Sequence, residues 1–210
     1  MDPGKMDYRR IKNETKEEQE ALWSGKLGED YNIRNESTQR YQLRTDFWDK
    51  ITSKPDVTNI LEIGCNKGYN LRCMDEGTHK LFGVDINYTA TNFCRRFLPW
   101  LNVFEGSVFD LPFKDGWFSL CFTVGVLIHI PPAQIRDAMA EIVRCSGKYV
   151  LCAEYWAKEE RERPFLDMIG VTWERPYGKL YMDMGLTLVE SGKLTKADGF
   201  NKLRYFLFKK

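Results

Sequence analysis

Short apolar runs alternate with segments of helical composition through the middle of the chain, and this alternation constrains the fold more than any other feature. The apolar runs are residues 57–64, 80–86, 117–124 and 148–155. Residues 89–100 and 132–145, which lie between them, have helical composition. Strands that alternate with helices form parallel sheets, because each helical crossover returns the chain to the same edge. We therefore expect an α/β fold with a mostly parallel sheet and helices on both faces.

The two ends of the chain add elements to this core. Residues 186–191 and 202–209 read as two further strands, which predicts an antiparallel finish. Residues 15–23 and 37–51 have helical composition around a glycine-bearing link and precede the first strand. A chain of 210 residues with 43% hydrophobic content can bury one core. We expect a single domain with an N-terminal helical cap at 1–55 and a core at 56–210.

Charge and cysteine content exclude several classes of protein. The 31 basic and 30 acidic residues leave a net charge of +1, which supplies no field for a nucleic acid, so we expect no nucleic-acid partner. The six cysteines form no CxxC pair and no zinc spacing, and no apolar leader is present, so we expect a reduced, cytoplasmic protein without a metal. No apolar run reaches the ~18 residues that a membrane span needs. The oligomeric state stays open.

A glycine loop follows the first strand of this core. Gly64 and Gly68 come directly after it, and Asp85 ends the next strand about 20 residues later, where a ribose-binding acid belongs in a nucleotide-binding βαβ unit. Asn66 takes the place of the middle glycine, and asparagine tolerates left-handed backbone angles. The loop is therefore predicted to bind a cofactor, and to open a helix.

The segment "EIGCNKG" resembles motif I of class I S-adenosylmethionine-dependent methyltransferases. The resemblance implies a Rossmann-like sheet of seven strands with an antiparallel last strand, and S-adenosyl-L-methionine as cofactor. By position it makes Glu62 the motif acid and Asp85 the acid that takes the ribose hydroxyls. The segment "EGSVFDLPF" is similar to a second family motif and implies that Ser107 and Val108 contact the adenine, which Ile86 flanks.

A narrower resemblance covers most of the chain. The segments "LWSGKLGEDYNIRN", "LEIGCNKGYNLR", "VGVLIHI" and "KYVLCAEYW" are similar to successive signatures of the methylases associated with pseudaminic acid biosynthesis. The resemblance implies O-methylation of a sugar or glycan hydroxyl, and it places Tyr31, Arg34 and Asn35 over the cofactor. This chain departs from that family after Trp156, so the identity of the sugar stays open.

Two titratable residues are candidates for the chemistry. His129 follows the fourth predicted strand at its carboxyl end, the edge where ligands bind in open α/β sheets. A neutral hydroxyl acceptor benefits from losing its proton, so His129 is the candidate general base. Glu154 ends the next strand and reaches the same edge, where it orients His129 or binds hydroxyls. The plain alternatives are a structural histidine and a solvated carboxylate.

Aromatic residues after the fifth predicted strand are the candidates for acceptor binding, in a substrate cap at about 156–183. They are Tyr155, Trp156, Trp173, Tyr177 and Tyr181. The alternative functions are methylation of another small molecule or of a protein, and a non-catalytic module that binds S-adenosylmethionine. Adenine methylation is disfavoured, because "VGVLIHIPP" stands where an N/D-P-P-Y/F motif would lie.

Overall fold

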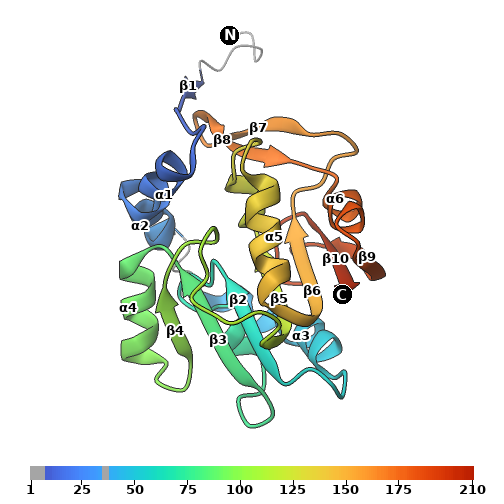
Figure 1. The fold of residues 1–210 in the computed structure, drawn as a ribbon. Coiled ribbons are helices and arrows are strands. Elements are labelled where there is room, and N and C mark those ends of the chain that lie inside the picture. The colour runs from blue at the N-terminus through green and yellow to red at the C-terminus, as the bar shows by residue number, and fades with distance from the viewer. Residues whose placement is uncertain (1–7, 35–37) are drawn as a thin grey trace.

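The computed structural model describes residues 8–34 and 38–210, and its centre is a seven-stranded sheet (Figure 1). The strand order is β4-β3-β2-β5-β6-β10-β9. β10 pairs antiparallel with both neighbours, and the other pairs are parallel, which confirms the predicted sheet and its antiparallel last strand. The strands are β2 (Asn59–Ile63), β3 (Lys80–Asp85), β4 (Asn102–Glu105), β5 (Phe118–Val124), β6 (Ser146–Glu154), β9 (Thr187–Leu194) and β10 (Leu203–Lys209).

Each face of the sheet has its own apolar core, because alternate residues of a strand point to opposite faces. In β2, Ile60 packs with α3 (Thr45–Thr52) and α4 (Tyr88–Phe97), whereas Leu61 packs with α5 (Ile135–Cys145) and α6 (Tyr177–Asp183). The predicted helices at 89–100 and 132–145 correspond to α4 and α5. Helices therefore cover both faces, as the sequence predicts.

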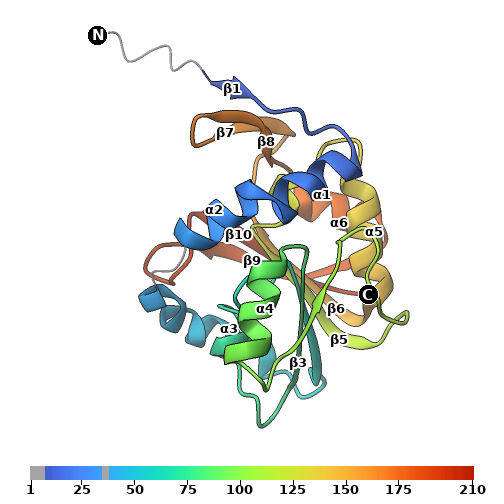
Figure 2. The same ribbon diagram turned by 90° about the vertical axis from the view of Figure 1, so that its left-hand side faces the viewer.

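The N-terminal residues form more helix than the sequence indicates. α1 (Lys16–Ser24) begins at Thr15, whose side chain accepts the N–H of Glu18 at 3.2 Å. α2 (Lys26–Arg34) follows after Gly25 and occupies the predicted link, while the predicted helix at 37–51 divides into the 3₁₀ helix η1 (Thr38–Arg44) and α3. α2 was not predicted because Gly28 and its many polar residues weaken the helical pattern of the sequence. Figure 2 shows α1 and α2 lying across the upper ends of the strands.

The glycine loop does not open an α-helix, which corrects the sequence prediction. Asn66 and Gly68 have φ angles of 48° and 72°, outside the right-handed helical region. Met74 is already extended, with φ −105° and ψ 150°, so only the short 3₁₀ helix η2 (Leu71–Cys73) fits between them.

The segment between β6 and β9 forms a hairpin above the sheet (Figures 1 and 2). β7 (Arg161–Phe165) pairs antiparallel with β8 (Met168–Glu174), and the short strand β1 (Arg9–Arg10) pairs parallel with β8. The sequence did not predict this second sheet, because the charged residues of β7 do not alternate with apolar ones as a strand signal requires. Among the described residues, no helix is both long and apolar enough to cross a membrane.

Candidate functional site

Two adjoining cavities lie where the carboxyl ends of the strands meet the N-terminal helices. The first, of about 100 Å³, is lined by Asp85 and is called the Asp85 cavity here. The second, of about 420 Å³, is lined by Phe165 of β7 and is called the Phe165 cavity. The two cavities share wall residues: Tyr31, Gly64, Asn66, Val124, Gly125 and His129. The site therefore has two chambers that meet at His129 and the glycine loop.

The glycine loop and the end of β3 hold the Asp85 carboxylate in place. The backbone N–H of Asn66 donates to Oδ2 at 2.7 Å and that of Asn87 donates to Oδ1 at 2.9 Å. Gly64 has φ +73°, and a Cβ there would lie 2.3 Å from Val126 Cγ2, so a side chain is excluded. Each oxygen of Asp85 keeps a lone pair for a further donor. This geometry suits a pair of vicinal hydroxyls.

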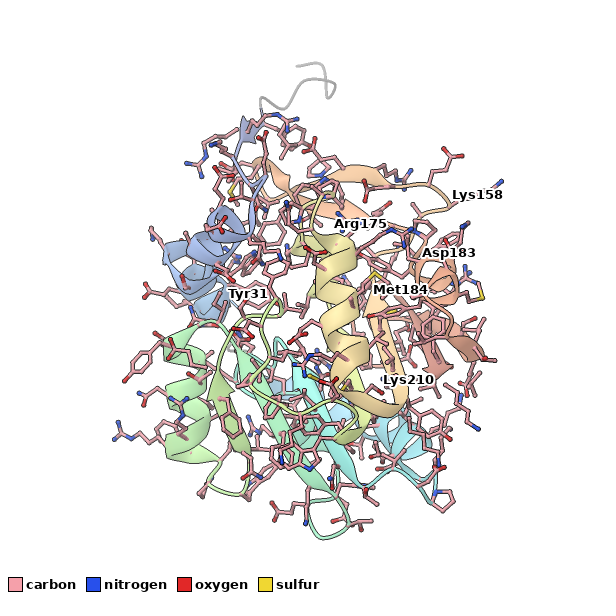
Figure 3. The ribbon with its side chains drawn as sticks, viewed as in Figure 1. Tyr31, Lys158, Arg175, Asp183, Met184 and Lys210 are labelled. Carbon is pink, nitrogen blue, oxygen red and sulfur yellow. The ribbon has the colours of Figure 1, made fainter. Side chains whose placement is uncertain are left out.

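Helix α2 closes over the same loop through Asn32, a residue that the sequence reading missed. Its Nδ2 donates to Asn87 Oδ1 at 2.8 Å, and its Oδ1 accepts from the side chain of Asn66. Asn32 is buried, and Tyr31 beside it, which is labelled in Figure 3, is among the residues that line both cavities. Both partners of Asn32 donate their backbone N–H groups to Asp85, so Asn32 links α2 to the residues that hold the Asp85 carboxylate.

Other residues of the Asp85 cavity come from strand ends and from α1. Ile86, Ser107 and Val108 line it. The Ser107 hydroxyl donates to Glu20 Oε1 and accepts from the N–H of Phe109 at 3.2 Å. Gln19, one turn before Trp23 on α1, lines the same cavity, and no local sequence signal marks it.

A carboxylate and a guanidinium face the Phe165 cavity. Burial raises the pKa of Glu62 to about 8. Its Oε1 accepts from Asn70 Nδ2 at 2.5 Å, whereas its buried Oε2 has no hydrogen-bond partner among the described residues. Arg44 donates to Asn70 Oδ1 at 2.7 Å and lines the same cavity. An acceptor beside a cation fits the amino and carboxylate groups of an amino acid.

Arg44 was not a predicted site residue, because nothing distinguishes it from the other basic side chains in the sequence. The predicted Arg34 is exposed, lines the Phe165 cavity and lies with its guanidinium 5.7 Å from the ring centre of Phe165. Gly68 lies in the loop, where its φ of +72° requires glycine. Asn35 lies outside the described residues.

His129 ends the 3₁₀ helix η3 (Leu127–His129) and lines both cavities. Its Nδ1 lies 3.0 Å from the carbonyl oxygen of Val171 in β8. A carbonyl only accepts, so Nδ1 carries the proton and Nε2 keeps its lone pair. The Trp23 ring lies 4.2 Å from the imidazole, centre to centre, and burial lowers the pKa of His129 to about 4. The imidazole is therefore neutral at neutral pH.

Glu154 supports η3 from below and does not reach either cavity. Its Oε1 accepts from Thr123 Oγ1 at 2.9 Å and from the N–H groups of Val126 and Leu127 at 3.3 Å, and Oε2 accepts from the N–H of Ile128 at 3.4 Å. The side chain is fully buried, and burial raises its pKa to about 7. This placement corrects the expectation that Glu154 contacts hydroxyls. It makes Glu154 a positioning residue for the helix that carries His129.

The structure separates the five predicted aromatic residues. Tyr155 lines the Phe165 cavity, with the Arg163 guanidinium 4.0 Å from its ring centre. Trp156 is half-exposed and lines a different groove. Three others are buried in the packing around β8 and α6, which corrects their prediction as acceptor contacts: Trp173, Tyr177 and Tyr181. Tyr177 and Tyr181 lie in α6 and pack into the apolar core on one face of the large sheet, whereas Trp173 lies in β8.

The aromatic walls of the Phe165 cavity come from elsewhere in the chain. They are Tyr31, Tyr41, Tyr69, Tyr155, Phe165 and Phe200. Phe165 lies in β7, with its ring centre 5.4 Å from that of His129. Sequence reasoning missed these residues, except Tyr31 and Tyr155, because four separate segments supply them and only the fold brings them together.

Comparisons with known proteins show which family model and which solved structures this chain resembles. Residues 60–147 match the family model described as "Methyltransferase domain". The 1,6-didemethyltoxoflavin-N1-methyltransferase of Burkholderia thailandensis, crystallised with S-adenosylhomocysteine, superposes with a TM-score of 0.75 at 13% identity, over 97% of this chain and 93% of that one. Magnesium protoporphyrin IX methyltransferase of Synechocystis PCC 6803, with S-adenosylhomocysteine bound, gives 0.67 at 13% identity, over 93% and 100%.

A third structure, the complex of a Haloferax volcanii putative methyltransferase with the Trm112 methyltransferase activator, gives a TM-score of 0.66 at 16% identity, over 86% of this chain and 94% of that one. No curated protein sequence matches the chain. At these identities the structural likeness supports the Rossmann-like methyltransferase fold, and the domain match supports the chemistry. The protein is an S-adenosylmethionine-dependent methyltransferase, and S-adenosylmethionine is its cofactor.

The residues of the two chambers fit this cofactor. The unpaired Oε2 of Glu62 and the Arg44 guanidinium suit its amino acid portion. The Asp85 carboxylate suits its ribose hydroxyls, and the apolar side chains of Ile86 and Val108 suit the faces of its adenine. The reacting end of the cofactor would then lie toward the shared wall, near His129.

Proposed function

We propose that the protein transfers a methyl group to a hydroxyl of a sugar, with His129 as the general base. The observation that carries the proposal is the contact of His129 Nδ1 with the Val171 carbonyl. It leaves Nε2 as a proton acceptor on a ring that lines both chambers. His129 thus lines the wall that the two chambers share, and the acceptor occupies the part of the Phe165 cavity that the amino acid portion of the cofactor leaves free.

When bound, S-adenosylmethionine supplies a methyl group on a positively charged sulfur, an activated leaving group that needs no metal. The protein holds the acceptor oxygen in line with that methyl group and removes its proton. Nε2 of His129 takes the proton, and the Val171 carbonyl stabilises the imidazolium that forms, since Nδ1–H donates to it. The low pKa of His129 makes it a weak base before the acceptor binds, but it keeps the ring unprotonated at neutral pH.

Sugar is the acceptor class that the Phe165 cavity suits best. Ring faces from Tyr155, Phe165 and Phe200 pack well against the C–H faces of a sugar, while Arg34 and Asn201 offer donors to its hydroxyls. The resemblance of four segments to the pseudaminic acid-associated methylases supports the same acceptor. We include in the proposal a cytoplasmic location and a cap formed by the residues around the β7–β8 hairpin.

The test is a release assay for S-adenosylhomocysteine over sugars, small phenols, peptides and oligonucleotides, with wild-type protein and His129→Asn. The asparagine amide can still donate to the Val171 carbonyl, but it offers no base. We expect sugars to be preferred, and the variant to lose rate by a factor of ~10² while cofactor affinity stays constant. His79→Asn, which changes the chain's other histidine, is the matched control.

Two outcomes would contradict the proposal. Preferred methylation of a phenol or a peptide, with all sugars inert, would leave a methyltransferase of another acceptor class. Near-wild-type turnover in His129→Asn would mean that positioning alone drives the reaction and that His129 is structural.

A further inference from the structure

A third cavity lies at the same edge of the sheet, beyond the Phe165 cavity. It is formed by the loop that joins β9 to β10 and by Trp156, which follows β6, and it is called the Trp156 groove here. Its volume is about 680 Å³. β9 ends and β10 begins at the carboxyl edge of the parallel strands, because β10 runs antiparallel to β6. The groove therefore opens on the side of the molecule where the acceptor binds.

The charged residues that line the Trp156 groove are all basic. They are Lys193, Lys196, Lys202 and Arg204. None of them forms an ion pair with a carboxylate among the residues that the structure describes. Asp198 lies in the same loop, but its Oδ2 is held by the N–H and the hydroxyl of Thr195, and it does not line the groove. Four cations without an ion-pair partner favour the binding of an anion.

Arg204 is also stacked on the aromatic ring that lines the groove. Its guanidinium carbon lies 4.7 Å from the ring centre of Trp156, and its Nε is buried without a hydrogen-bond partner among the described residues. This stacking holds the planar guanidinium beside the groove, where its other N–H groups can donate to an anion. Trp156 itself stays 39% exposed, so part of its ring is free to stack against a planar group.

The groove is continuous with the site already described. Leu203 lines both the Trp156 groove and the Phe165 cavity. Residues that are adjacent in the sequence line the two cavities on either side of this boundary. Tyr155 lines the Phe165 cavity and Trp156 lines the groove; likewise, Asn201 lines the Phe165 cavity and Lys202 lines the groove. One ligand can therefore occupy both, with its reacting group near His129 and an anionic group in the groove.

We propose that the Trp156 groove binds the diphosphate of a nucleoside diphosphate-linked sugar, with the base stacked on Trp156 and the sugar in the Phe165 cavity. A diphosphate matches several cations better than a single carboxylate does, and the planar base uses the exposed ring. The near-zero net charge of the chain favours a small anion over a nucleic acid strand. The sugar part rests on the proposed function, whereas the diphosphate part rests on the groove alone.

Calorimetric titration of the full chain with uridine diphosphate, and separately with inorganic pyrophosphate, tests the groove without any methyl transfer. We expect both to bind, uridine diphosphate more tightly, and both to weaken as salt increases. The double variant Lys196→Gln/Lys202→Gln should weaken both by about tenfold or more. Trp156→Leu should weaken uridine diphosphate several-fold and leave pyrophosphate unchanged. The matched control is Lys80→Gln/Lys209→Gln, two exposed lysines at the opposite edge of the sheet.

The outcomes separate this proposal from the proposed function. If the double variant and its control bind both probes like the wild type, or if the wild type binds neither probe while it binds S-adenosylhomocysteine, the groove proposal fails. A single-stranded oligonucleotide that binds at least tenfold more tightly than uridine diphosphate, through the same lysines, would also overturn it. Binding of the probes with every sugar inert as acceptor would instead support the groove and contradict the sugar proposal.

Discussion

Glu154 and Arg175 hold the same short helix from opposite ends. The Glu154 carboxylate accepts the N–H groups that begin η3, while the fully buried Arg175 guanidinium donates to the carbonyls of Leu127 at 2.9 Å and Ile130 at 2.7 Å. Figure 3 shows Arg175 near the upper end of α5, on the side of the hairpin. The two side chains fix the position of His129 at the boundary between the two chambers.

We expect Glu154→Gln to lower kcat by about tenfold without changing cofactor affinity. The amide of glutamine presents an NH₂ group in place of one carboxylate oxygen. The backbone N–H groups at the start of η3 then lose an acceptor, and His129 shifts. Above pH 7, where Glu154 is ionised, the loss of charge-assisted hydrogen bonds should also lower the free energy of unfolding by about 1–3 kcal/mol. Steady-state kinetics and urea denaturation measure the two effects. Glu159→Gln, at an exposed position in the loop that follows β6, is the control. Equal kcat values in the two variants would rule out the positioning role.

The buried imidazole predicts how stability depends on pH. Burial lowers the pKa of His129 from its usual 6.5 to about 4, so between these values the unfolded chain binds a proton that the folded chain does not. The contribution of His129 to stability is therefore complete above pH 6.5 and is lost as the pH falls toward 4. We expect the difference in unfolding free energy between wild type and His129→Asn to shrink by about 2 kcal/mol from pH 7 to pH 5. Urea denaturation at each pH measures it, and a constant difference would show that the imidazole is not buried in a neutral form.

Asp85 should dominate cofactor affinity. Replacing it by alanine removes a carboxylate that can accept two ribose hydroxyls, which should cost roughly 2–3 kcal/mol of binding, or about 30- to 150-fold in Kd. Calorimetry with S-adenosylhomocysteine measures this loss. Asp49→Asn, on the exposed side of α3, should bind like the wild type. Unchanged affinity in a folded Asp85→Ala variant would show that Asp85 does not bind the ribose of the cofactor.

The sequence predicts the sheet and the cofactor loop because local chemistry determines both. Each strand run is shorter than ten residues, and the φ requirement at Gly64 and Gly68 and the carboxylate that ends β3 lie between residues 64 and 85. Asn32 and Arg44 were missed because their roles come from contacts over long sequence separations, 55 residues for Asn32 with Asn87 and 26 for Arg44 with Asn70. No local pattern distinguishes such a residue from a surface one.

The acceptor side was the least predictable part of the site. Composition indicates that the segment after β6 is rich in aromatic rings, but only the β7–β8 pairing decides which rings face a cavity. The bulge in that pairing between Arg163 and Phe165 is not encoded by simple alternation, so the face on which Phe165 lies could not be predicted. Tyr181, with the same aromatic character, is fully buried against Phe208 of β10.

The contrast between Phe165 and Tyr181 gives the last prediction. Phe165→Leu removes a ring that faces the acceptor, and each stacked ring contributes about 0.5–1.5 kcal/mol beyond burial, so KM for the acceptor should rise several-fold. Tyr181→Phe removes a hydroxyl that is buried without a hydrogen-bond partner among the described residues. Its KM should equal that of the wild type, and its free energy of unfolding should stay constant or increase by up to about 1 kcal/mol, since an unsatisfied polar group is lost. Kinetics over a range of acceptor concentrations and thermal denaturation check both variants. A rise in KM for Tyr181→Phe, with none for Phe165→Leu, would contradict this assignment. It would indicate that the acceptor contacts Tyr181, as the sequence analysis predicts, and not Phe165.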